Sequence, residues 1–269
     1  INEVGGKKAI DYFVDDNKIS DQMVLADMKL AGTIPTDVVL FNIDSKSEVN
    51  GKQSKVAIVS VLQNVFNEMQ GFSGSNPFLA DLERKLTEEG KYNLFKEKFE
   101  DSFGSAWEES RSDFDFIQDD VVEVLDEIGF MSIEAGRNWC EKATGEYTYK
   151  VEDFARLVKK YLDKKESNHH IVFLIDEIGQ YIGDDSKLML NLQTVTEDLG
   201  TACGGKAWII VTSQQDIDSI TKTKGNDFSK IQGRFDTRLS LSSANVDEVI
   251  KKRILEKERS GKTDTYTAL

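Results

Sequence analysis

Two adjacent carboxylates, Asp176 and Glu177, follow directly after the five apolar residues from Ile171 to Ile175. An unalternating, β-branched run of this length is typical of a strand that is buried on both faces of a parallel sheet. In such sheets the carboxyl ends of the strands form the ligand crevice, so we expect the pair at the rim of a binding site. One carboxylate there can hold Mg²⁺, and a second can orient or deprotonate an attacking water.

This pattern is that of a Walker B motif, in which Asp176 would bind the metal and Glu177 would activate water for nucleotide hydrolysis. The alternative is a buried strand that runs into a solvated acidic turn. A short apolar run followed by Asp-Glu arises often by chance, so the motif gains weight only from the groups that surround it.

A second apolar run, residues 207 to 211, predicts another buried strand, and it ends in Thr212 and Ser213. In P-loop hydrolases the end of the strand beside Walker B carries sensor 1, a hydrogen-bond donor that reaches toward the γ-phosphate or the attacking water. Either hydroxyl is a candidate for this role. The alternative for each is that it caps a helix starting near Gln215.

Two arginines near the carboxyl end, Arg234 and Arg238, are candidates for a group that acts on phosphate. A guanidinium beside a transferred phosphoryl group can raise its rate of transfer by roughly 10³ to 10⁵. Residues 233 to 236 resemble the second region of homology of AAA+ ATPases, where such an arginine acts across a subunit boundary. A surface ion pair with Asp236 or Asp227 is the alternative for both.

The elements that would position these groups alternate between strands and helices. We expect a strand over residues 38 to 43, a loop at 45 to 48, and a helix whose apolar stripe runs from Ile58 to Met69. A loop at 179 to 183 follows the Walker B strand. The remaining predicted helices span residues 7 to 16, 20 to 31, 79 to 89, 92 to 102, 117 to 128, 132 to 143, 151 to 165 and 245 to 257. Residues 184 to 186 can cap a further helix, whose buried stripe is Leu188, Leu192, Val195 and Leu199.

This order predicts an α/β fold: an AAA+-type P-loop NTPase core with a parallel sheet, whose first strand is missing, and a large all-helical insertion. The phosphate-binding pattern G-x-x-x-x-G-K-[ST] occurs nowhere in the chain. We expect three parts, which are the start of the core over 1–53, the helical insertion over 54–167, and the Walker B, sensor and arginine part with the start of a lid over 168–269. The short strand at 237–241 is expected to form no direct hydrogen-bond ladder with the strand at 207–211, which ends in the sensor 1 candidates.

The composition favours a soluble cytoplasmic protein. The chain has 34 basic and 48 acidic residues, a formal charge of -14, which argues against a protein built mainly to coat nucleic acid. Its longest apolar runs have five residues, whereas a membrane-spanning helix needs about 20. The spacing of Cys140, Cys203, His169 and His170 does not fit a structural zinc site. Because the sequence begins at Ile1, we expect a fragment or a processed product.

Longer stretches of the chain resemble a particular family, the large P-loop ATPase of BREX phage-exclusion systems (the BrxC/PglY family). The stretches that carry the resemblance are residues 39 to 47, 65 to 72, 173 to 183, 188 to 194 and 231 to 243. The likeness covers essentially the whole chain, and the departure from the family is the absent Walker A segment.

The resemblance implies an intracellular bacterial ATPase that binds ATP with Mg²⁺, self-associates through its nucleotide interface, and acts with other BREX proteins, indirectly, on phage DNA. In that case Asp176 holds the metal, Glu177 and Arg234 are catalytic, and Thr212, Ser213 and Arg238 lie at the nucleotide. The alternative function is a non-hydrolytic, nucleotide-dependent scaffold within the defence complex. Glu177 discriminates the two, since hydrolysis needs a residue that orients water and binding alone does not.

Overall fold

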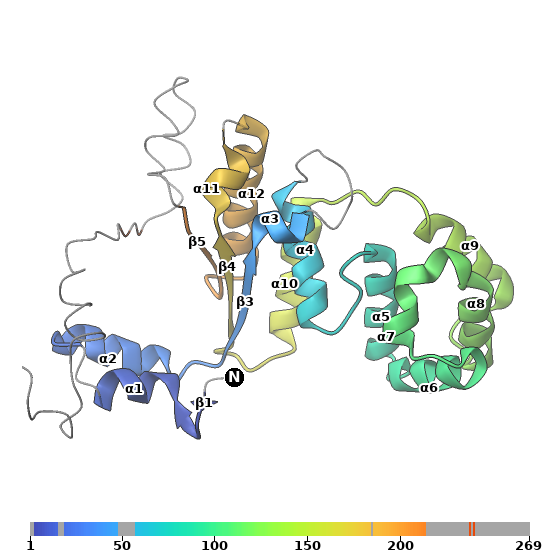
Figure 1. Cartoon of the computed structure of the whole chain (residues 1–269), viewed down its shortest axis with the longest axis horizontal. Coiled ribbons are helices and arrows are strands. Elements are labelled where there is room, and N and C mark those ends of the chain that lie inside the picture. The colour runs from blue at the N-terminus through green and yellow to red at the C-terminus, as the bar shows by residue number, and fades with distance from the viewer. Residues whose placement is uncertain are drawn as a thin grey trace, which may run out of the picture. The chain divides into compact units, whose positions relative to one another are not determined.

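The computed structural model describes residues 3–15, 19–47, 57–183, 185–213, 237 and 239. The chain divides into two compact units, Ile1–Arg234 and Phe235–Leu269, and the fold described below is that of the first unit (Figure 1).

The elements follow one another in this order. The amino-terminal part contains β1 (Glu3–Val4), β2 (Lys7–Lys8), α1 (Ala9–Asp15) and α2 (Gln22–Ala31). Next come β3 (Thr36–Asn42), α3 (Ile43–Ser47) and α4 (Ile58–Met69). A run of helices follows: α5 (Pro77–Glu88), α6 (Tyr92–Phe103), α7 (Trp107–Ser110), the 3-10 helix η2 (Arg111–Phe116), α8 (Gln118–Glu127) and α9 (Ile133–Ala143). The last described elements are α10 (Val151–Asp163), β4 (His170–Asp176), α11 (Ile178–Ile182), α12 (Ser186–Ala202) and β5 (Ala207–Val211).

Among the described residues, the larger sheet has three parallel strands in the order β3-β4-β5, and β1 and β2 form a separate antiparallel pair. The register places Asn42 opposite Asp176, and Ile175 opposite Val211. Both strand pairs are parallel, as expected for the predicted sheet, and the fold class is α/β. The helices α4, α10 and α12 are the crossover connections between these strands (Figure 1).

One face of the sheet packs against these crossover helices. Phe173 of β4 points into this layer, where its ring lies 6.2 Å from that of Phe66 on α4 and 5.9 Å from that of Phe154 on α10. All three side chains are fully buried. Aromatic residues of this size contribute most of the apolar area in such a layer, so this cluster holds the covering helices against the sheet.

The opposite face of the sheet is open in the described part of the chain. Val38, Leu40, Trp208 and Ile210 are 55%, 71%, 54% and 48% exposed, so the expectation that residues 207 to 211 form a strand buried on both faces is wrong there. Both crossovers step in one direction along the sheet, and right-handed crossovers then place every connecting helix on the same face.

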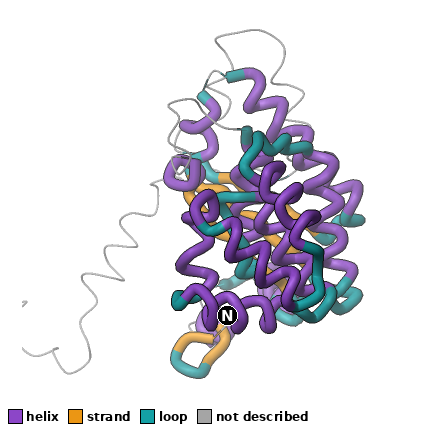
Figure 2. The backbone as a smooth tube through the Cα atoms, turned by 90° about the vertical axis from the view of Figure 1, so that its right-hand side faces the viewer, coloured by secondary structure: helices purple, strands orange, loops and turns teal. Residues whose placement is uncertain are grey.

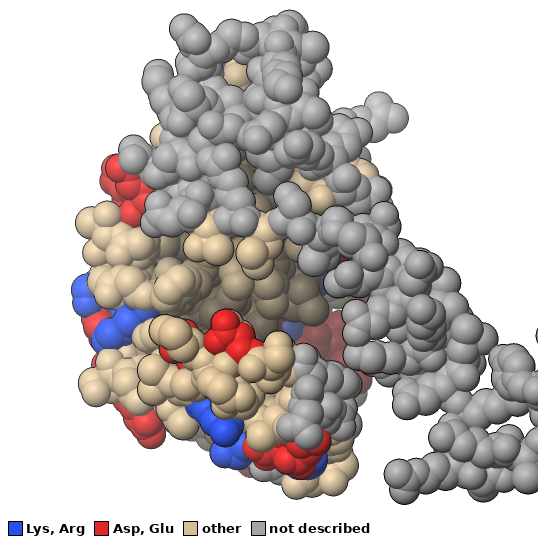
Figure 3. Space-filling model, turned by 90° about the vertical axis from the view of Figure 1, so that its left-hand side faces the viewer, with Lys and Arg blue, Asp and Glu red and all other residues tan. Residues whose placement is uncertain are grey.

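The helices α1 and α2 reach only part of this open face. Between them and the sheet lies a hollow of about 600 Å³, whose lining includes Phe13, Met28, Val172 and Trp208. Figure 3 shows the described surface on this side hollowed among mostly uncharged residues. Within the described residues, the open face therefore remains largely apolar and accessible.

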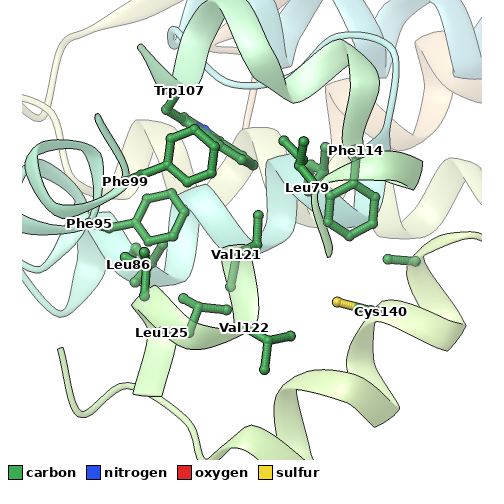
Figure 4. Packing of buried hydrophobic residues seen from close by; sticks show 14 residues of the cluster. Leu79, Leu86, Phe95, Phe99, Trp107, Phe114, Val121, Val122, Leu125 and Cys140 are labelled. Carbon is green, nitrogen blue, oxygen red and sulfur yellow. The ribbon is translucent and has the colours of Figure 1, made fainter. Parts of the chain in front are cut away.

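The helices from α5 to α9 enclose a core of their own (Figure 4). Its fully buried members include Leu86, Phe95, Phe99 and Trp107. The whole buried set is Leu79, Leu82, Leu86, Phe95, Phe99, Trp107, Phe114, Ile117, Val121, Val122, Val124, Leu125, Cys140 and Ala143. We call residues 77–143 the helical unit.

A buried carboxylate, Glu83, lies inside the helical unit and is fully hydrogen-bonded. It accepts bonds from the Ser73 backbone N–H at 2.6 Å, the Tyr92 hydroxyl at 3.1 Å, the Trp107 indole N–H at 2.7 Å and the Arg111 guanidinium at 2.8 Å. A buried charge is tolerated when it is paired and hydrogen-bonded in this way. Glu83 thereby joins the start of the unit to α6, α7 and η2.

The segment Val124–Gly129, which mimics an apolar run leading into Asp-Glu, lies in helix α8 and its end, as its apolar spacing predicts. Val121, Val122 and Leu125 are buried, whereas Asp126 and Glu127 are exposed. Figure 2 shows how largely helical the described chain is around its short strands. None of the helices in the described ranges combines the length and apolarity needed to cross a membrane.

Candidate functional site at the carboxyl edge of the sheet

The predicted carboxylates lie at the edge of the sheet where all three strands end. Asp176 is the last residue of β4, directly opposite Asn42, the last residue of β3. Thr212 follows β5, and its backbone N–H donates to the Ile175 carbonyl at 3.0 Å. The parallel register thus brings Asn42, Asp176, Glu177 and Thr212 to one edge, where ligands bind in open α/β sheets.

Glu177 has a left-handed backbone conformation, with φ 61° and ψ 26°. It is the one residue other than glycine with positive φ among those that the structure describes. Such a conformation is costly for a residue with a Cβ atom, and it persists where the surrounding contacts enforce it. Glu177 marks the point at which the chain leaves β4 and enters α11.

Helix α11 replaces the loop expected over residues 179 to 183, so that expectation is wrong. Ile178, Tyr181 and Ile182 are buried at helical spacing, and the Ile178 N–H donates to the Thr212 carbonyl at 3.1 Å. This contact fixes the start of α11 against the end of β5. The strained turn at Glu177 is thus held by elements on both sides of it.

The Thr212 hydroxyl connects the two acidic residues. Its Oγ1 accepts a hydrogen bond from the Glu177 backbone N–H at 3.1 Å and donates one to Asp176 Oδ1. The sequence left open whether Thr212 or Ser213 approaches the site, and the structure places the Thr212 hydroxyl on the acidic pair. Ser213 is the next residue and is half-buried. The helix near Gln215 that either hydroxyl was expected to cap lies outside the described residues.

Asn42 is a site residue that the sequence did not single out. Its Nδ2 donates to Glu177 Oε2 at 2.8 Å, while its Oδ1 accepts from the Ser45 backbone N–H at 3.2 Å. Ser45 lies in helix α3, which begins at Ile43 where a loop over 45 to 48 was expected. The Ser45 contact fixes which way the Asn42 amide points, and Asn42 in turn orients the Glu177 carboxylate.

The chemistry of these donors suits a hard cation. Asp176, Glu177, Thr212 and Asn42 present only carboxylate, hydroxyl and amide groups, and no thiol or imidazole belongs to the group. Among the described residues no three His, Cys, Asp or Glu side chains lie close enough together to form a complete metal cage. Mg²⁺ fits such a site, because it takes one or two carboxylates and completes its shell with phosphate oxygens and water.

Both candidate arginines, Arg234 and Arg238, lie outside the described residues, as does the helix predicted over 245–257. Of the short strand predicted at 237–241 the structure describes residues 237 and 239 alone, and Leu239 is 87% exposed. The expected gap between this strand and β5 therefore stays a prediction.

A second polar cluster lies at the opposite, amino-terminal edge of the sheet. Asp37 Oδ2 accepts a hydrogen bond from the Tyr161 hydroxyl at 2.6 Å and lies 2.7 Å from His169 Nε2. Burial acts to raise the pKa of Asp37, but the hydrogen bonds from Tyr161 and His169 outweigh it and hold that pKa below its ordinary value. Burial, together with the Asp37 contact, raises the pKa of Tyr161. This cluster ties α10 to β3 and lies away from the carboxyl edge.

The fold and the site together define an α/β protein with a parallel sheet and an acidic, hydroxyl-bridged cluster at its carboxyl edge. No family model matches the chain, and no solved structure matches it significantly.

Proposed function

We propose that this chain is part of an AAA+-type ATPase that binds and hydrolyses ATP with Mg²⁺ in the full-length protein. The observation that carries the proposal is the placement of Glu177. It is held in a left-handed turn at the carboxyl end of β4, between the Thr212 hydroxyl and the Asn42 amide and directly after Asp176. Backbone strain that fixes a carboxylate at a sheet edge is typical of a reactive group.

Each residue has a role in this proposal. Asp176 holds Mg²⁺, which when bound neutralises charge on the phosphates. Glu177 orients the attacking water and accepts its proton, because its Oε2 is already fixed by Asn42. Thr212, which is hydrogen-bonded to Asp176, acts as sensor 1 and detects whether the γ-phosphate is present. Ser213 is the next residue. Arg234 or Arg238 acts on the nucleotide of a neighbouring subunit.

The test compares the intact protein with its Glu177→Gln variant. The amide keeps the shape of the side chain but accepts no proton, so ATP binding stays within about twofold while turnover falls by at least about 100-fold. Glu152→Gln, on the exposed side of α10, is the matched control and keeps wild-type turnover. ATP turnover is measured by phosphate release, and ATP binding by calorimetry.

The same assay applied to residues 1 to 269 gives no turnover, because the backbone N–H cradle and the lysine of a phosphate loop are absent from this sequence. Turnover by this chain that Glu177→Gln abolishes would overturn that expectation. Binding of ATP without turnover by the intact wild-type protein would instead favour the non-hydrolytic scaffold. Undiminished turnover of the intact Glu177→Gln protein would overturn the role given to Glu177.

The biological setting proposed is a cytoplasmic BREX phage-defence system, supported by the resemblance of the motifs around Asp176 and Arg234. The expected partners are further copies of the protein and other BREX proteins. Co-purification of the intact, tagged protein with these components from a host that carries the system tests this assignment. Loss of phage resistance in a host carrying Glu177→Gln connects the setting to the chemistry.

A further inference from the structure

The helical unit packs around itself rather than around the sheet. Every buried member of its apolar core lies between Leu79 and Ala143. The sheet, in contrast, is covered by α4, α10 and α12, whose contacts include Phe66 and Phe154 against Phe173. The described chain thus contains two apolar cores, and α4 lies where they adjoin.

Helix α4 has a polar side as well as an apolar side. Ser60, Gln63 and Asn67 are all buried, at 2%, 3% and 0% exposure, and their spacing of three and four residues places them on one stripe. Phe66, which lies on another side of the helix, packs against Phe173 of the sheet. Helix α4 therefore presents a stripe of polar side chains, one hydroxyl and two amides, on a side that does not carry Phe66.

Side-chain hydrogen bonds span this polar stripe, which we call the seam. The Gln63 amide donates to the Tyr147 hydroxyl at 3.1 Å, and the Tyr149 hydroxyl donates to Asn64 Oδ1 at 3.1 Å. A third bond joins α4 to the helical unit itself, from Arg84 Nη2 to Asn67 Oδ1 at 2.7 Å. An ion pair between Lys164, which directly follows α10, and Glu88 of α5, at 2.7 Å, adds a further polar link.

The seam is not fully satisfied. Asn67 Nδ2 and Arg84 Nε are buried and have no acceptor within the described part of the chain. Burial lowers the pKa of the Arg84 guanidinium, although nearby Asp81 opposes the shift. A buried donor without an acceptor costs free energy, because it has lost its hydrogen bonds to water and gained none within the protein. When the surface opens, water can bond to the donor again and this cost disappears. Closure of the seam is therefore weakly favoured.

The chain enters and leaves the helical unit through segments 70–76 and 144–150. The first of these is bonded to both of its neighbours. The Gly71 carbonyl accepts from Arg111 at 3.0 Å and the Ser73 N–H donates to Glu83, while the Phe72 N–H donates to the Asn67 carbonyl of α4 at 3.0 Å. Gly71 has φ +82°, a conformation open to glycine and costly for other residues. A bend on this side would therefore fall within residues 71 to 73, between the last bonds to α4 and the bond from Ser73 to Glu83.

We propose that the helical unit is a rigid arm that turns on α4 as the polar seam opens and closes. Polar interfaces between separate cores permit relative motion by default. The arm keeps its own core during the turn, because none of that core is shared with the sheet. This inference goes beyond ATP hydrolysis and holds for the chain with or without nucleotide.

The experiment measures distances between spin labels on the chain of residues 1–269 by pulsed electron paramagnetic resonance. One pair joins the arm to the sheet layer, with Glu123→Cys on α8 and Lys187→Cys on α12. The control pair lies within the arm, with Glu97→Cys on α6 and Glu123→Cys. All three positions are exposed, and the native Cys140 and Cys203 are buried.

The expected result is a narrow single distance for the control pair and two distances, or a distribution at least twice as wide, for the pair that spans the seam. Equally narrow single distances for both pairs overturn the proposal. A distribution as broad within the arm as across the seam overturns it as well, because the arm is then not rigid.

Variants of the seam test its part in the motion. Replacing both orphaned donors, with Asn67→Leu and Arg84→Met, removes the gain from opening and also the bond between these two side chains. Because an apolar pair in place of both partners is close to neutral or stabilising, the populations shift toward the closed arm by at least threefold. Gln63→Leu with Tyr147→Phe is the second variant and is expected to act in the same direction. Lys91→Met, which removes a bond within the arm to the Gly129 carbonyl, leaves the populations unchanged. Unchanged populations in both seam variants overturn the role of the seam.

Discussion

At the scale of single residues, Glu177 is held in a conformation whose cost glycine, which has no side chain, avoids. The left-handed conformation costs a residue with a Cβ atom roughly 1–2 kcal/mol, and glycine adopts it freely. We therefore expect Glu177→Gly to unfold with a free energy about 1 kcal/mol higher than that of Glu177→Ala. Urea denaturation of the two variants measures this difference.

Both of these variants lack the carboxylate, so the comparison isolates the backbone. A matched pair at Glu152 in α10, where φ is helical, gives the opposite order, because glycine weakens a helix by about 1 kcal/mol relative to alanine. Glycine and alanine of equal stability at position 177 would show that the turn carries no strain.

Asn42 is expected to act on turnover through the orientation of Glu177. Asn42→Ala removes the bond to Oε2 and leaves the carboxylate free to turn, so turnover in the intact protein falls by about 10-fold with ATP affinity nearly unchanged. Asn64→Ala, which removes a comparable bond in the seam, is the control and keeps wild-type turnover. A fall in ATP affinity with no change in turnover would assign Asn42 to binding instead.

The sequence predicted Asp176 and Glu177 as site residues, because an apolar run directly before two carboxylates is visible in one segment. For the same reason, the sequence limited the candidate hydroxyl group to that of Thr212 or Ser213, because both directly follow an apolar run. Asn42 was missed because its role depends on the register of two strands that are far apart in the chain: it donates to a residue 135 positions away. A lone asparagine at a strand end carries no sign of that partner.

At the scale of elements, the longer helices were predictable from their apolar period, and α5, α6, α8, α9 and α10 lie within a few residues of their predicted bounds. The amino-terminal cap of α12 was also predictable from the sequence. In the structure Asp185 accepts hydrogen bonds from the backbone N–H groups of Lys187 and Leu188. The helices α3 and α11 were expected to be loops. Each has five residues, fewer than two turns, so no period could indicate them.

The amino-terminal edge of the sheet is expected to make the free energy of unfolding depend on pH in the acid range. The pKa of Asp37 is held below its ordinary value of 3.8, so the ionised carboxylate stabilises the fold at higher pH and this stabilisation disappears as the pH falls through the folded-state pKa. The stability gap between wild type and Asp37→Asn should therefore be constant above about pH 5 and shrink below about pH 4. Urea denaturation across this range measures the gap.

The imidazole of His169 lies against Asp37 and contributes to the same stability gap. Repeating the comparison in a His169→Gln background removes that contribution, and the shrinkage below about pH 4 should persist. A gap that stays constant down to pH 3 would mean that the Asp37 contacts do not favour the ionised form.

At the scale of the whole molecule, the two faces of the sheet should tolerate charge very differently. Leu40 is 71% exposed on the open face, and its neighbour Val39 is 6% exposed on the face that the helices cover. We expect Leu40→Lys to cost less than about 0.5 kcal/mol of unfolding free energy in the chain of residues 1 to 269, and Val39→Lys to cost about 3 kcal/mol or more.

Thermal and urea unfolding of the two variants decide the comparison. A loss at Leu40→Lys as large as that at Val39→Lys would show that both faces are covered. The sequence could not reveal this asymmetry, because the apolar runs at 171–175 and 207–211 read as buried on both sides. Which face the helices cover follows from crossover handedness, a property of the topology.

The position of the helical unit between β3 and β4 has a consequence for how the sheet forms during folding. The contact between Asn42 and Glu177 closes a loop whose ends are 135 positions apart. Loop-closure entropy grows only as the logarithm of length, so doubling a loop costs about 0.6 kcal/mol more. Because the unit has its own core, it can collapse first from local contacts and leave roughly half of that loop flexible. A parallel pairing that looks remote along the chain is then reached at nearly the rate of an uninterrupted crossover.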